Sequence, residues 1–177
     1  AAVSHDNSTS GTDLNFTNHY DVVTVPVAKS WSDDNNRDNK RPASITVNLF
    51  ADGTKVASQK IMAANDWKYQ FTDLPKYKDG KEIKYTITED AVAGYTSSID
   101  GFNITNTYTP EKVQVSGSKN WNDDGNAAGT RPGSITIRLY ANGSEIGHKT
   151  VTEKDGWSWN WTGLNRYDTD HKEISYT

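Results

Sequence analysis

Residues 21–31 alternate between apolar and polar positions, which predicts a β-strand with one buried face. The side chains expected on that face are Val23, Val25, Val27, Lys29 and Trp31. Lys29 is the exception among them, because an amine on an apolar face must be paired, neutralised or consumed by a reaction. The sequence therefore predicts a buried lysine near the end of a core strand.

Two other segments alternate in the same way, and each places one polar residue on its apolar face. Glu89 continues the apolar face of residues 83–89, and Asn106 lies within the apolar face of residues 102–108. The apolar members of these faces are Ile83, Tyr85 and Ile87 in the first segment and Phe102, Ile104 and Tyr108 in the second. Because the apolar faces of packed strands share one core, we expect Lys29, Glu89 and Asn106 to meet there.

The rest of the chain is predicted to be almost entirely β-structure. Residues 44–50 alternate, Asp52-Gly53 favours a tight hairpin turn, and residues 55–62 form the expected return strand. Residues 67–71 alternate between aromatic and polar side chains, and only a short helical turn at residues 74–78 is expected. Short strands spaced by roughly 8–12 residues with turn residues between them predict a β-sandwich.

The sequence repeats itself after 90 positions, which is the strongest sign of its organisation. Lys29-Ser30-Trp31 returns as Lys119-Asn120-Trp121. Further matches at this spacing pair residues 41–47 with 131–137, residues 49–53 with 139–143, and Trp67 with Trp157. Residues 14–20 match residues 102–108, which makes Asn18 the counterpart of Asn106.

This repetition predicts three parts. Residues 1–20 are expected to hold the last strands of a preceding repeat, residues 21–110 a complete repeat, and residues 111–177 the front of a further repeat. We interpret the chain as a window cut from a longer tandem array. The alternative is that the strand with Asn18 completes the unfinished repeat of another molecule.

The amino-acid composition excludes several kinds of chemistry and of binding partner. Hydrophobic residues make up 33% of the 177 residues, mean hydropathy is −0.83, and no apolar run is long enough to span a bilayer. The absence of cysteine excludes disulfides, thiolate nucleophiles and cysteine-ligated metals. The net charge of −4, with both signs interspersed, argues against nucleic acid as a partner. No signal peptide is recognised, so we expect a mature chain or a fragment.

The three inward polar residues are suited to reacting with one another. Burial favours the neutral forms of an amine and a carboxyl group. A neutral amine is a nucleophile, and a protonated carboxyl group can donate a hydrogen bond and shuttle protons. We therefore expect an amide bond between Lys29 Nζ and Asn106 Cγ, with ammonia as the leaving group and Glu89 assisting. The alternative is that Lys29 extends to water from its strand end and Glu89 is solvated.

Three motifs resemble those of a known family. Lys29-Ser30-Trp31, residues 85–90 (YTITED) and residues 104–108 (ITNTY) are similar to the B-type repeats of the collagen adhesin, the Cna B-type repeats of Gram-positive cell-surface proteins. The resemblance implies an all-β fold of reverse immunoglobulin-like β-sandwich repeats in tandem. It also implies an isopeptide bond between Lys29 and Asn106 with Glu89 as the assisting acid. Lys119 and Asn18 match the bond-forming positions of the partial repeats.

The resemblance further implies a structural role outside the cell. Such repeats serve as stalks or spacers of adhesins and pilins, need no cofactor, and perform a single self-reaction rather than enzymatic turnover. The expected partners are neighbouring repeats and, through a sorting signal outside this chain, peptidoglycan, which gives an extracellular, wall-anchored location. The alternatives are a module that binds a host protein or glycan directly, and an enzyme such as a glycosidase.

Other candidate sites are weaker. Residues 33–38 resemble a calcium loop but lack its glycine and distal glutamate, so we favour a solvated polar loop over residues 32–40. Three tryptophans, Trp157, Trp159 and Trp161, are a candidate sugar-binding platform, but their strand alternation favours core aromatics. The histidines show no metal-ligand spacing, so no metal site is predicted.

Overall fold

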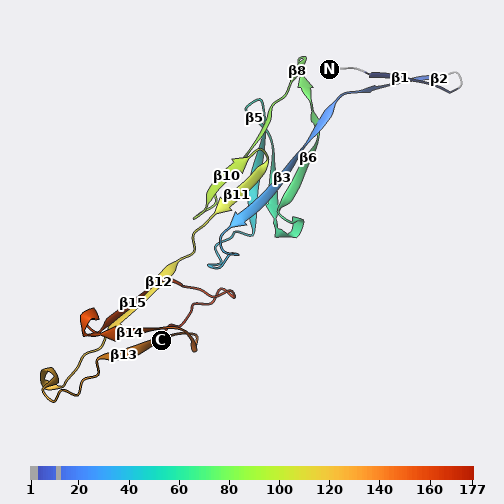
Figure 1. Ribbon diagram of the computed structural model, residues 1–177. Helices are drawn as coiled ribbons and strands as arrows, with labels where there is room; N and C mark the ends of the chain where they lie inside the picture. Colours follow the sequence, from blue (N-terminus) through green and yellow to red (C-terminus); the bar gives the residue numbers. More distant parts are fainter. Residues whose placement is uncertain (1–3, 11–12) are drawn as a thin grey trace. The chain divides into compact units, whose positions relative to one another are not determined.

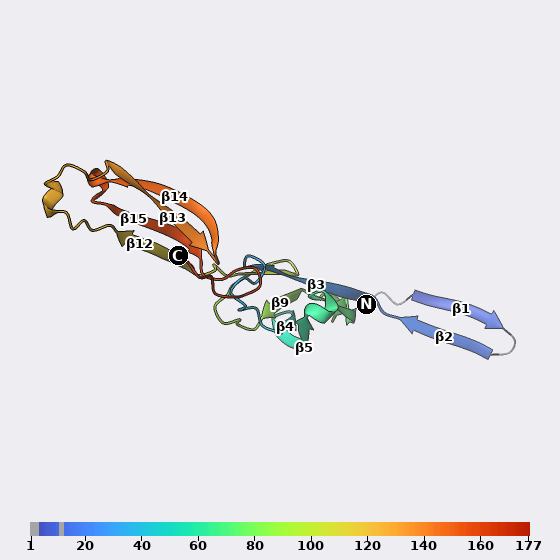
Figure 2. The same cartoon turned by 90° about the horizontal axis from the view of Figure 1, so that it is seen from below.

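The computed structural model describes the backbone of residues 4–10 and 13–177, and side chains from Tyr20 onward. The chain divides into two compact units: unit 1 comprises residues 1–32 and 41–108, and unit 2 comprises residues 33–40 and 109–177. Figures 1 and 2 show the elements of each unit.

The strands of unit 1 are β1 (Ser4–Ser10), β2 (Asp13–His19), β3 (Val22–Ser32), β4 (Ser44–Ala51), β5 (Thr54–Met62), β6 (Lys68–Pro75), β7 (Tyr77–Lys78), β8 (Lys81–Glu82), β9 (Tyr85–Glu89), β10 (Thr96–Asp100) and β11 (Asn103–Thr107). Those of unit 2 are β12 (Lys112–Ser118), β13 (Ser134–Ala141), β14 (Ser144–Thr152) and β15 (Ser158–Asn165).

Unit 1 is a sandwich of two sheets that share one hydrophobic core. One sheet has the strand order β10-β11-β3-β6, and the other has the order β5-β4-β9. Both sheets contribute to the core, whose buried members are Val25, Val27, Ile45, Val47, Leu49, Ile61, Phe71, Ile87 and Ile104. The predicted all-β, immunoglobulin-like sandwich is therefore confirmed.

The alternation of β3 determines which of its side chains are buried. Val25 and Val27 are each 2% exposed and Lys29 is 7% exposed, whereas the residues between them face outward or are half-buried. A strand presents successive side chains to opposite faces, so the apolar valines fix the register that also carries Lys29 into the core.

The first and last strands of the sandwich are neighbours. β3 pairs with β11 in parallel, with Ile104 opposite Lys29 and Asn106 opposite Trp31. On its other side, β3 pairs with β6 in an antiparallel ladder. β11 begins opposite Ala28, so the earlier part of β3 has an edge without a β11 neighbour. Pro26, which lacks a backbone N–H, lies in that earlier part, where its missing donor is tolerated.

The hairpin near the amino terminus has the same register as the one that carries Asn106. β1 pairs with β2 so that His5 lies opposite Asn18, and β10 pairs with β11 so that Ser97 lies opposite Asn106. The side chain of Asn18, predicted to lie on an apolar face, belongs to the part of the chain whose side chains are not described.

Unit 2 forms part of the same arrangement of strands as unit 1. β12 pairs with β15, β13 pairs with β14, and Ala141 forms a bridge with Tyr176. Its buried apolar side chains are Leu139, Val151 and Trp157. Lys119 N donates to Trp157 O at 2.8 Å, which repeats the 2.8 Å bond from Lys29 N to Trp67 O in unit 1. The backbone geometry thus follows the 90-residue repeat.

The predicted helical turn does not form, and short helical segments occur at other positions. Residues 74–78, expected to form a short helical turn, instead end β6 and form β7. Asp73, with a left-handed φ of 56°, lies at the register shift in the pairing of β6 with β3. The short 3-10 segments of the described chain lie elsewhere, at Ala63–Asn65, Asp124–Asn126 and Glu153–Asp155. In the described residues, no helix has the length and apolar character required to cross a membrane.

Candidate functional site

Lys29, Glu89 and Asn106 meet inside the core of unit 1. Lys29 Nζ lies 3.1 Å from Glu89 Oε1, and the two side chains are 0% and 1% exposed. Asn106 Nδ2 donates to the same Glu89 oxygen at 3.2 Å, and Asn106 is completely buried. One carboxylate oxygen therefore contacts both the amine and the carboxamide, without access to water.

Three strands from two sheets bring these side chains together. Lys29 comes from β3 and Asn106 from the adjacent β11, while Glu89 is the last residue of β9 in the opposite sheet. Glu89 lies opposite Val47, a fully buried residue of β4. The carboxylate is thus presented from one sheet to an amine and an amide held side by side on the other.

Aromatic rings cover this polar group. The Lys29 amine lies 4.4 Å from the centroid of the Trp31 ring, a distance at which a cation or an amine is held by the ring face. Trp31 packs edge-on against Trp67 at 5.1 Å and against Tyr95 at 5.0 Å. Tyr95 in turn lies 5.4 Å from Tyr108. These rings supply the dry environment around the amine.

Trp67 also holds the backbone of Lys29. Its carbonyl accepts a hydrogen bond from Lys29 N, and its own φ of 57° lies in the left-handed region that bulky residues rarely adopt. The counterpart Trp157 has a φ of 52° and makes the equivalent bond to Lys119. Sequence reasoning placed Trp67 in the core, but a left-handed tryptophan leaves no signal in hydrophobic periodicity.

The corresponding lysine of unit 2 is placed differently. Lys119 is exposed, although its amine still lies 4.9 Å from the Trp121 ring. Arg131 lies over the same ring at 5.5 Å, and it bonds Asp123 through Nη2 at 2.6 Å. The hydrogen bond from Arg131 is the main cause that lowers the pKa of Asp123 below its ordinary value of 3.8. Unit 2 therefore repeats the lysine beside a half-buried ring, but its lysine is exposed.

Two aspartates of the polar loop at residues 33–38 are buried, so the expectation of a solvated loop is wrong for them. Asp33 is 2% exposed and accepts from Asn36 N at 2.9 Å. Asp38 is 7% exposed and accepts from Glu111 N at 2.6 Å within unit 2. These carboxylates satisfy backbone N–H groups, and no cluster of three metal-ligating side chains occurs in the described residues.

The core position predicted for three tryptophans of unit 2 is fully borne out for one of them. Trp157 is 8% exposed, and Trp159 and Trp161 are half-buried on β15, opposite Gly117 and Val115 of β12. Rings packed into an adjacent strand present little of the flat surface that a sugar platform requires.

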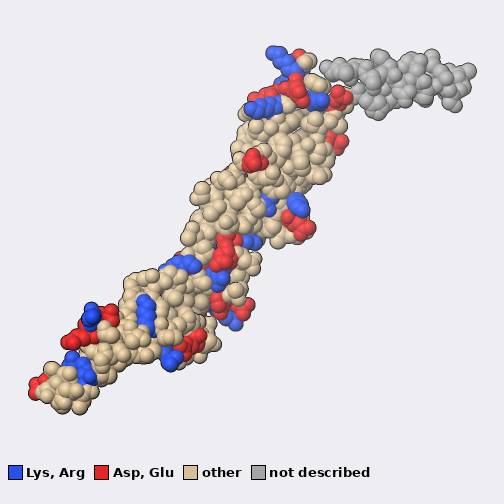
Figure 3. All heavy atoms as spheres, in the orientation of Figure 1, with Lys and Arg blue, Asp and Glu red and all other residues tan. Residues whose placement is uncertain are grey.

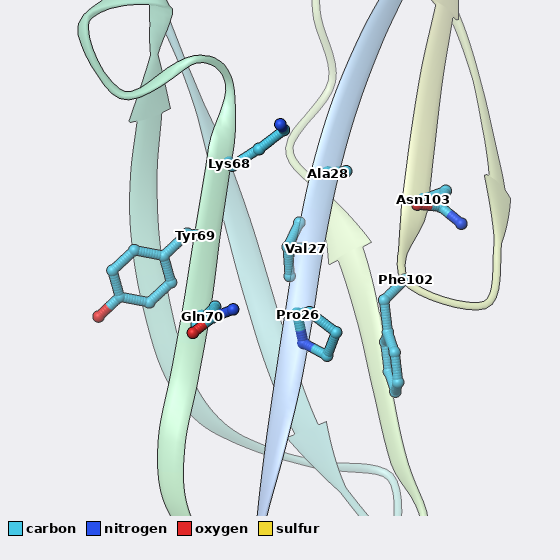
Figure 4. Close-up of a pocket in the computed structure, with 8 residues that line it drawn as sticks. All are labelled: Pro26, Val27, Ala28, Lys68, Tyr69, Gln70, Phe102 and Asn103. Atoms are coloured by element: carbon cyan, nitrogen blue, oxygen red, sulfur yellow. The ribbon is translucent and has the colours of Figure 1, made fainter.

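A shallow cavity of about 270 Å³ lies on the first sheet of unit 1, where β11 begins (Figure 4). Its polar side chains are Lys68, Gln70 and Asn103, and Pro26 and Phe102 form apolar walls. It contains none of the three residues of the buried group. Lys29, Glu89 and Asn106 therefore face one another rather than this opening.

Charged side chains of both signs are interspersed on the face shown in Figure 3. Among the described residues, Arg138 pairs with Glu145 at 2.8 Å and Arg166 pairs with Glu111 at 2.8 Å. Paired charges of this kind form a surface of mixed charge rather than the clustered basic face that is typical of nucleic-acid-binding proteins.

Comparison with known proteins places this chain in a family. The model of the Cna protein B-type domain matches residues 25–107 and 115–177. The chain is 42% identical over 175 residues to the collagen adhesin of Staphylococcus aureus, and the match covers 97% of this chain and 15% of the adhesin.

Two solved structures from the same organism are similar to the chain. A single B repeat unit (B1) of the collagen binding surface protein matches with a TM-score of 0.50 and 40% identity, covering 89% of this chain and 84% of that one. The two-repeat structure B1B2 matches with a TM-score of 0.51 and 39% identity, covering 99% of this chain and 48% of that one. The family model covers most of both units, and the chain therefore belongs to the Cna protein B-type domain family.

Proposed function

We propose that this chain is a stalk or spacer module of a bacterial cell-surface adhesin, and that its complete repeat is locked by an amide bond between Lys29 and Asn106. Glu89 is the assisting acid. The observation that carries the proposal is the position of Glu89 Oε1, 3.1 Å from the amine and 3.2 Å from the carboxamide nitrogen, in a group closed to water.

The reaction needs no partner from outside the core. A proton passes from the Lys29 ammonium to Glu89, which leaves a neutral amine beside a carboxylic acid. The amine attacks Asn106 Cγ while the acid donates to the carboxamide, and a proton from the amine reaches Nδ2 as the C–N bond breaks. Ammonia leaves, an amide joins the two side chains, and no oxidant or cofactor is consumed.

Burial of polar atoms without partners favours the reaction, and the fixed positions of the reacting groups accelerate it. Groups held in contact react with a high effective concentration, because the entropy of bringing them together is already spent in folding. In the described structure, Asn106 Oδ1 and Glu89 Oε2 are buried without a hydrogen-bond partner. Buried polar atoms of this kind raise the free energy of the unreacted state, and the reaction replaces the ion pair with a neutral amide.

Intact mass spectrometry tests the proposal. The purified chain is expected to be lighter than its sequence by one ammonia, and a peptide digest is expected to yield one branched peptide that joins Lys29 to Asn106. Lys29→Ala, Asn106→Ala and Glu89→Ala are each expected to restore the full mass. An unmodified mass for the native chain would contradict the cross-link.

Matched controls separate the three roles. Lys119→Ala removes the equivalent but exposed lysine of unit 2, and Asn103→Ala removes an exposed asparagine of the same strand as Asn106. Both are expected to keep the mass deficit. A deficit that persists in Glu89→Ala would show that another group assists the reaction.

The names of the matched relatives support a proposal for the location and partners of the module. The matched proteins are named a collagen adhesin and a collagen binding surface protein, and the chain spans 15% of the adhesin's length. We infer an extracellular location, attachment to peptidoglycan through a sorting signal outside this chain, and neighbouring repeats as partners. Bond formation in each repeat is a single self-reaction, not turnover.

The division into repeats extends the same proposal. Residues 1–20 contribute the last strands of one repeat, residues 21–110 form a complete repeat, and residues 111–177 form the front of another. In the described part of unit 2, β12 has no neighbour equivalent to β11, and beside β13 only residues 175–177 take the place of β9. Strands of that kind, with a residue equivalent to Asn106, would complete the sandwich around Lys119. If Asn18 of a second copy fills this role, size-exclusion chromatography will show concentration-dependent dimers.

A further inference from the structure

Asn48 is a buried polar residue that the cross-linking group does not use. It is 5% exposed and lies in β4 between Val47 and Leu49, which point into the core. Because side chains alternate along a strand, Asn48 points to the opposite face of its sheet. There its cross-strand neighbours are Ser58 of β5 and Thr88 of β9.

Hydrogen bonds extend from Asn48 to both neighbouring strands. Ser58 Oγ donates to Asn48 Oδ1 at 2.7 Å, and Asn48 Nδ2 donates to Asp90 Oδ1 at 2.8 Å. A longer contact of 3.4 Å joins Asn48 Nδ2 to Thr88 Oγ1. The bond to Asp90 is charge-assisted and short, which makes it the strongest link of this network.

These contacts fix the strand end that carries Glu89. Thr88 and Asp90 are the residues on either side of Glu89, and both contact Asn48. The backbone of Asp90 also donates to Thr46 O at 3.0 Å. Glu89 is the last residue of β9, so without these links the chain around it would depend on the final rungs of one ladder.

We propose that Asn48 is a positioning residue for the cross-linking reaction: it holds Asp90 and Thr88 so that the carboxyl group of Glu89 stays within contact of Lys29 and Asn106. This role rests on the proposed function, because it concerns the rate of the same reaction. Asn48 itself touches none of the reacting atoms.

The second repeat shows that a hairpin of this kind does not need an asparagine here. The equivalent residue of β13 is Arg138, whose side chain is 55% exposed and bonds Glu145. β13 still pairs with β14 over its full length. Pairing of β4 with β5 therefore does not require an asparagine at this position, and the contacts of Asn48 beyond that hairpin are with Thr88 and Asp90.

The rate of cross-linking tests the proposal. The full chain is synthesised in a cell-free system and sampled over time, and mass spectrometry gives the fraction that has lost ammonia. Asn48→Leu keeps the shape of the side chain without its hydrogen bonds, and is expected to slow the reaction roughly ten- to a hundred-fold. Asp90→Ala breaks the same bond from the other side and should slow it similarly, which covers the case in which Asn48→Leu does not fold.

Two controls separate positioning from general stability. Ser58→Ala removes the outer hydrogen bond but leaves the one to Asp90, and Ile61→Val loosens the core in β5. Both are expected to react at nearly the native rate. Equal slowing in Ile61→Val and Asn48→Leu, or native rates in both Asn48→Leu and Asp90→Ala, would overturn the positioning role.

A spectroscopic signal reports the geometry directly. In a Lys29→Ala background no bond can form, and the side-chain amide resonance of Asn106 reports its hydrogen bond to Glu89. Adding Asn48→Leu is expected to shift that resonance, whereas adding Ile61→Val is not, and an unchanged resonance would also overturn the proposal. A native chain that never loses ammonia would instead contradict the cross-link itself.

Discussion

The carboxylate of Glu89 lies 3.1 Å from the amine of Lys29, and neither side chain has more than 1% of its surface exposed. Desolvating two charges is expensive, and their mutual attraction offsets this cost only when the geometry is good. A pair of this kind is a weak device for stability alone. Its position beside Asn106 supports the proposed cross-link, from which several measurable consequences follow.

Loss of the cross-link is expected to lower the melting temperature of the complete repeat. A bond between residues 29 and 106 closes a loop of most of the domain, and such loops contribute about 4–5 kcal/mol in the chain-entropy model. Lys29→Ala or Asn106→Ala should therefore lower the Tm of unit 1 by roughly 20 °C. Differential scanning calorimetry measures this, and Lys119→Ala should leave that transition unchanged.

The buried ion pair of Lys29 and Glu89 is expected to affect the stability of unit 1 even when the amide bond to Asn106 cannot form. In an Asn106→Ala background, Glu89→Leu leaves the Lys29 amine buried without its carboxylate, which should cost about 3–5 kcal/mol. Adding Lys29→Met to that variant removes the second charge and should restore most of the loss. Urea denaturation gives the free energies of unfolding. No recovery in the triple variant would show that the cost arises from packing rather than from charge.

Substitutions at Gly117 and Trp159 are expected to have coupled effects on the stability of unit 2, because a larger residue at position 117 needs a smaller one at position 159. A Cβ atom added at Gly117 would lie 2.7 Å from the Trp159 ring, whereas the equivalent pair in unit 1 is Val27 opposite Tyr69. Gly117→Val should therefore destabilise unit 2 by roughly 1–3 kcal/mol. The further change Trp159→Tyr should recover part of this loss.

A double-mutant cycle from denaturation curves measures that coupling. Gly117→Val paired with Val151→Ala, a buried change on another strand, serves as the additive comparison. Additive effects for Gly117 and Trp159 would contradict a direct steric contact.

The acid stability of unit 2 is expected to depend on Asp123. The Arg131 hydrogen bond lowers the pKa of this carboxyl group below 3.8, so the unfolded chain binds a proton more readily than the folded one. Its contribution is therefore present above pH 3.8 and is lost as the pH falls through the lower folded pKa. NMR titration should give a depressed pKa in the native chain and an ordinary one in Arg131→Gln. Equal values would remove the ion pair as the cause.

Much of the fold could be predicted from the sequence because period-two alternation reports directly which face of a strand is buried. The buried positions of β3, including Lys29, follow from it, and so does the burial of Asn106. The 90-residue repeat supplied the equivalence of Lys29 and Lys119, and the conserved backbone bonds to Trp67 and Trp157 bear out that spacing.

The burial of several polar side chains could not be predicted, because it depends on hydrogen bonds rather than on apolar periodicity. Asp33 and Asp38 are buried since their carboxylates satisfy backbone N–H groups, which their polar sequence context does not reveal. Asn48 is covered by Ser58 and by Asp90, a residue 42 positions away. Such pairings depend on which strands are neighbours, and this information is absent from a local pattern.

The parallel pairing of β3 with β11 determines how the repeat would carry tension. The chain enters the complete repeat, residues 21–110, at β3 and leaves it after the end of β11, so pulling on both ends loads the two strands in shear. With Lys29 joined to Asn106, the load would pass through the amide, and residues 30–105 would lie outside its path. Such a repeat would transmit force without lengthening by unfolding.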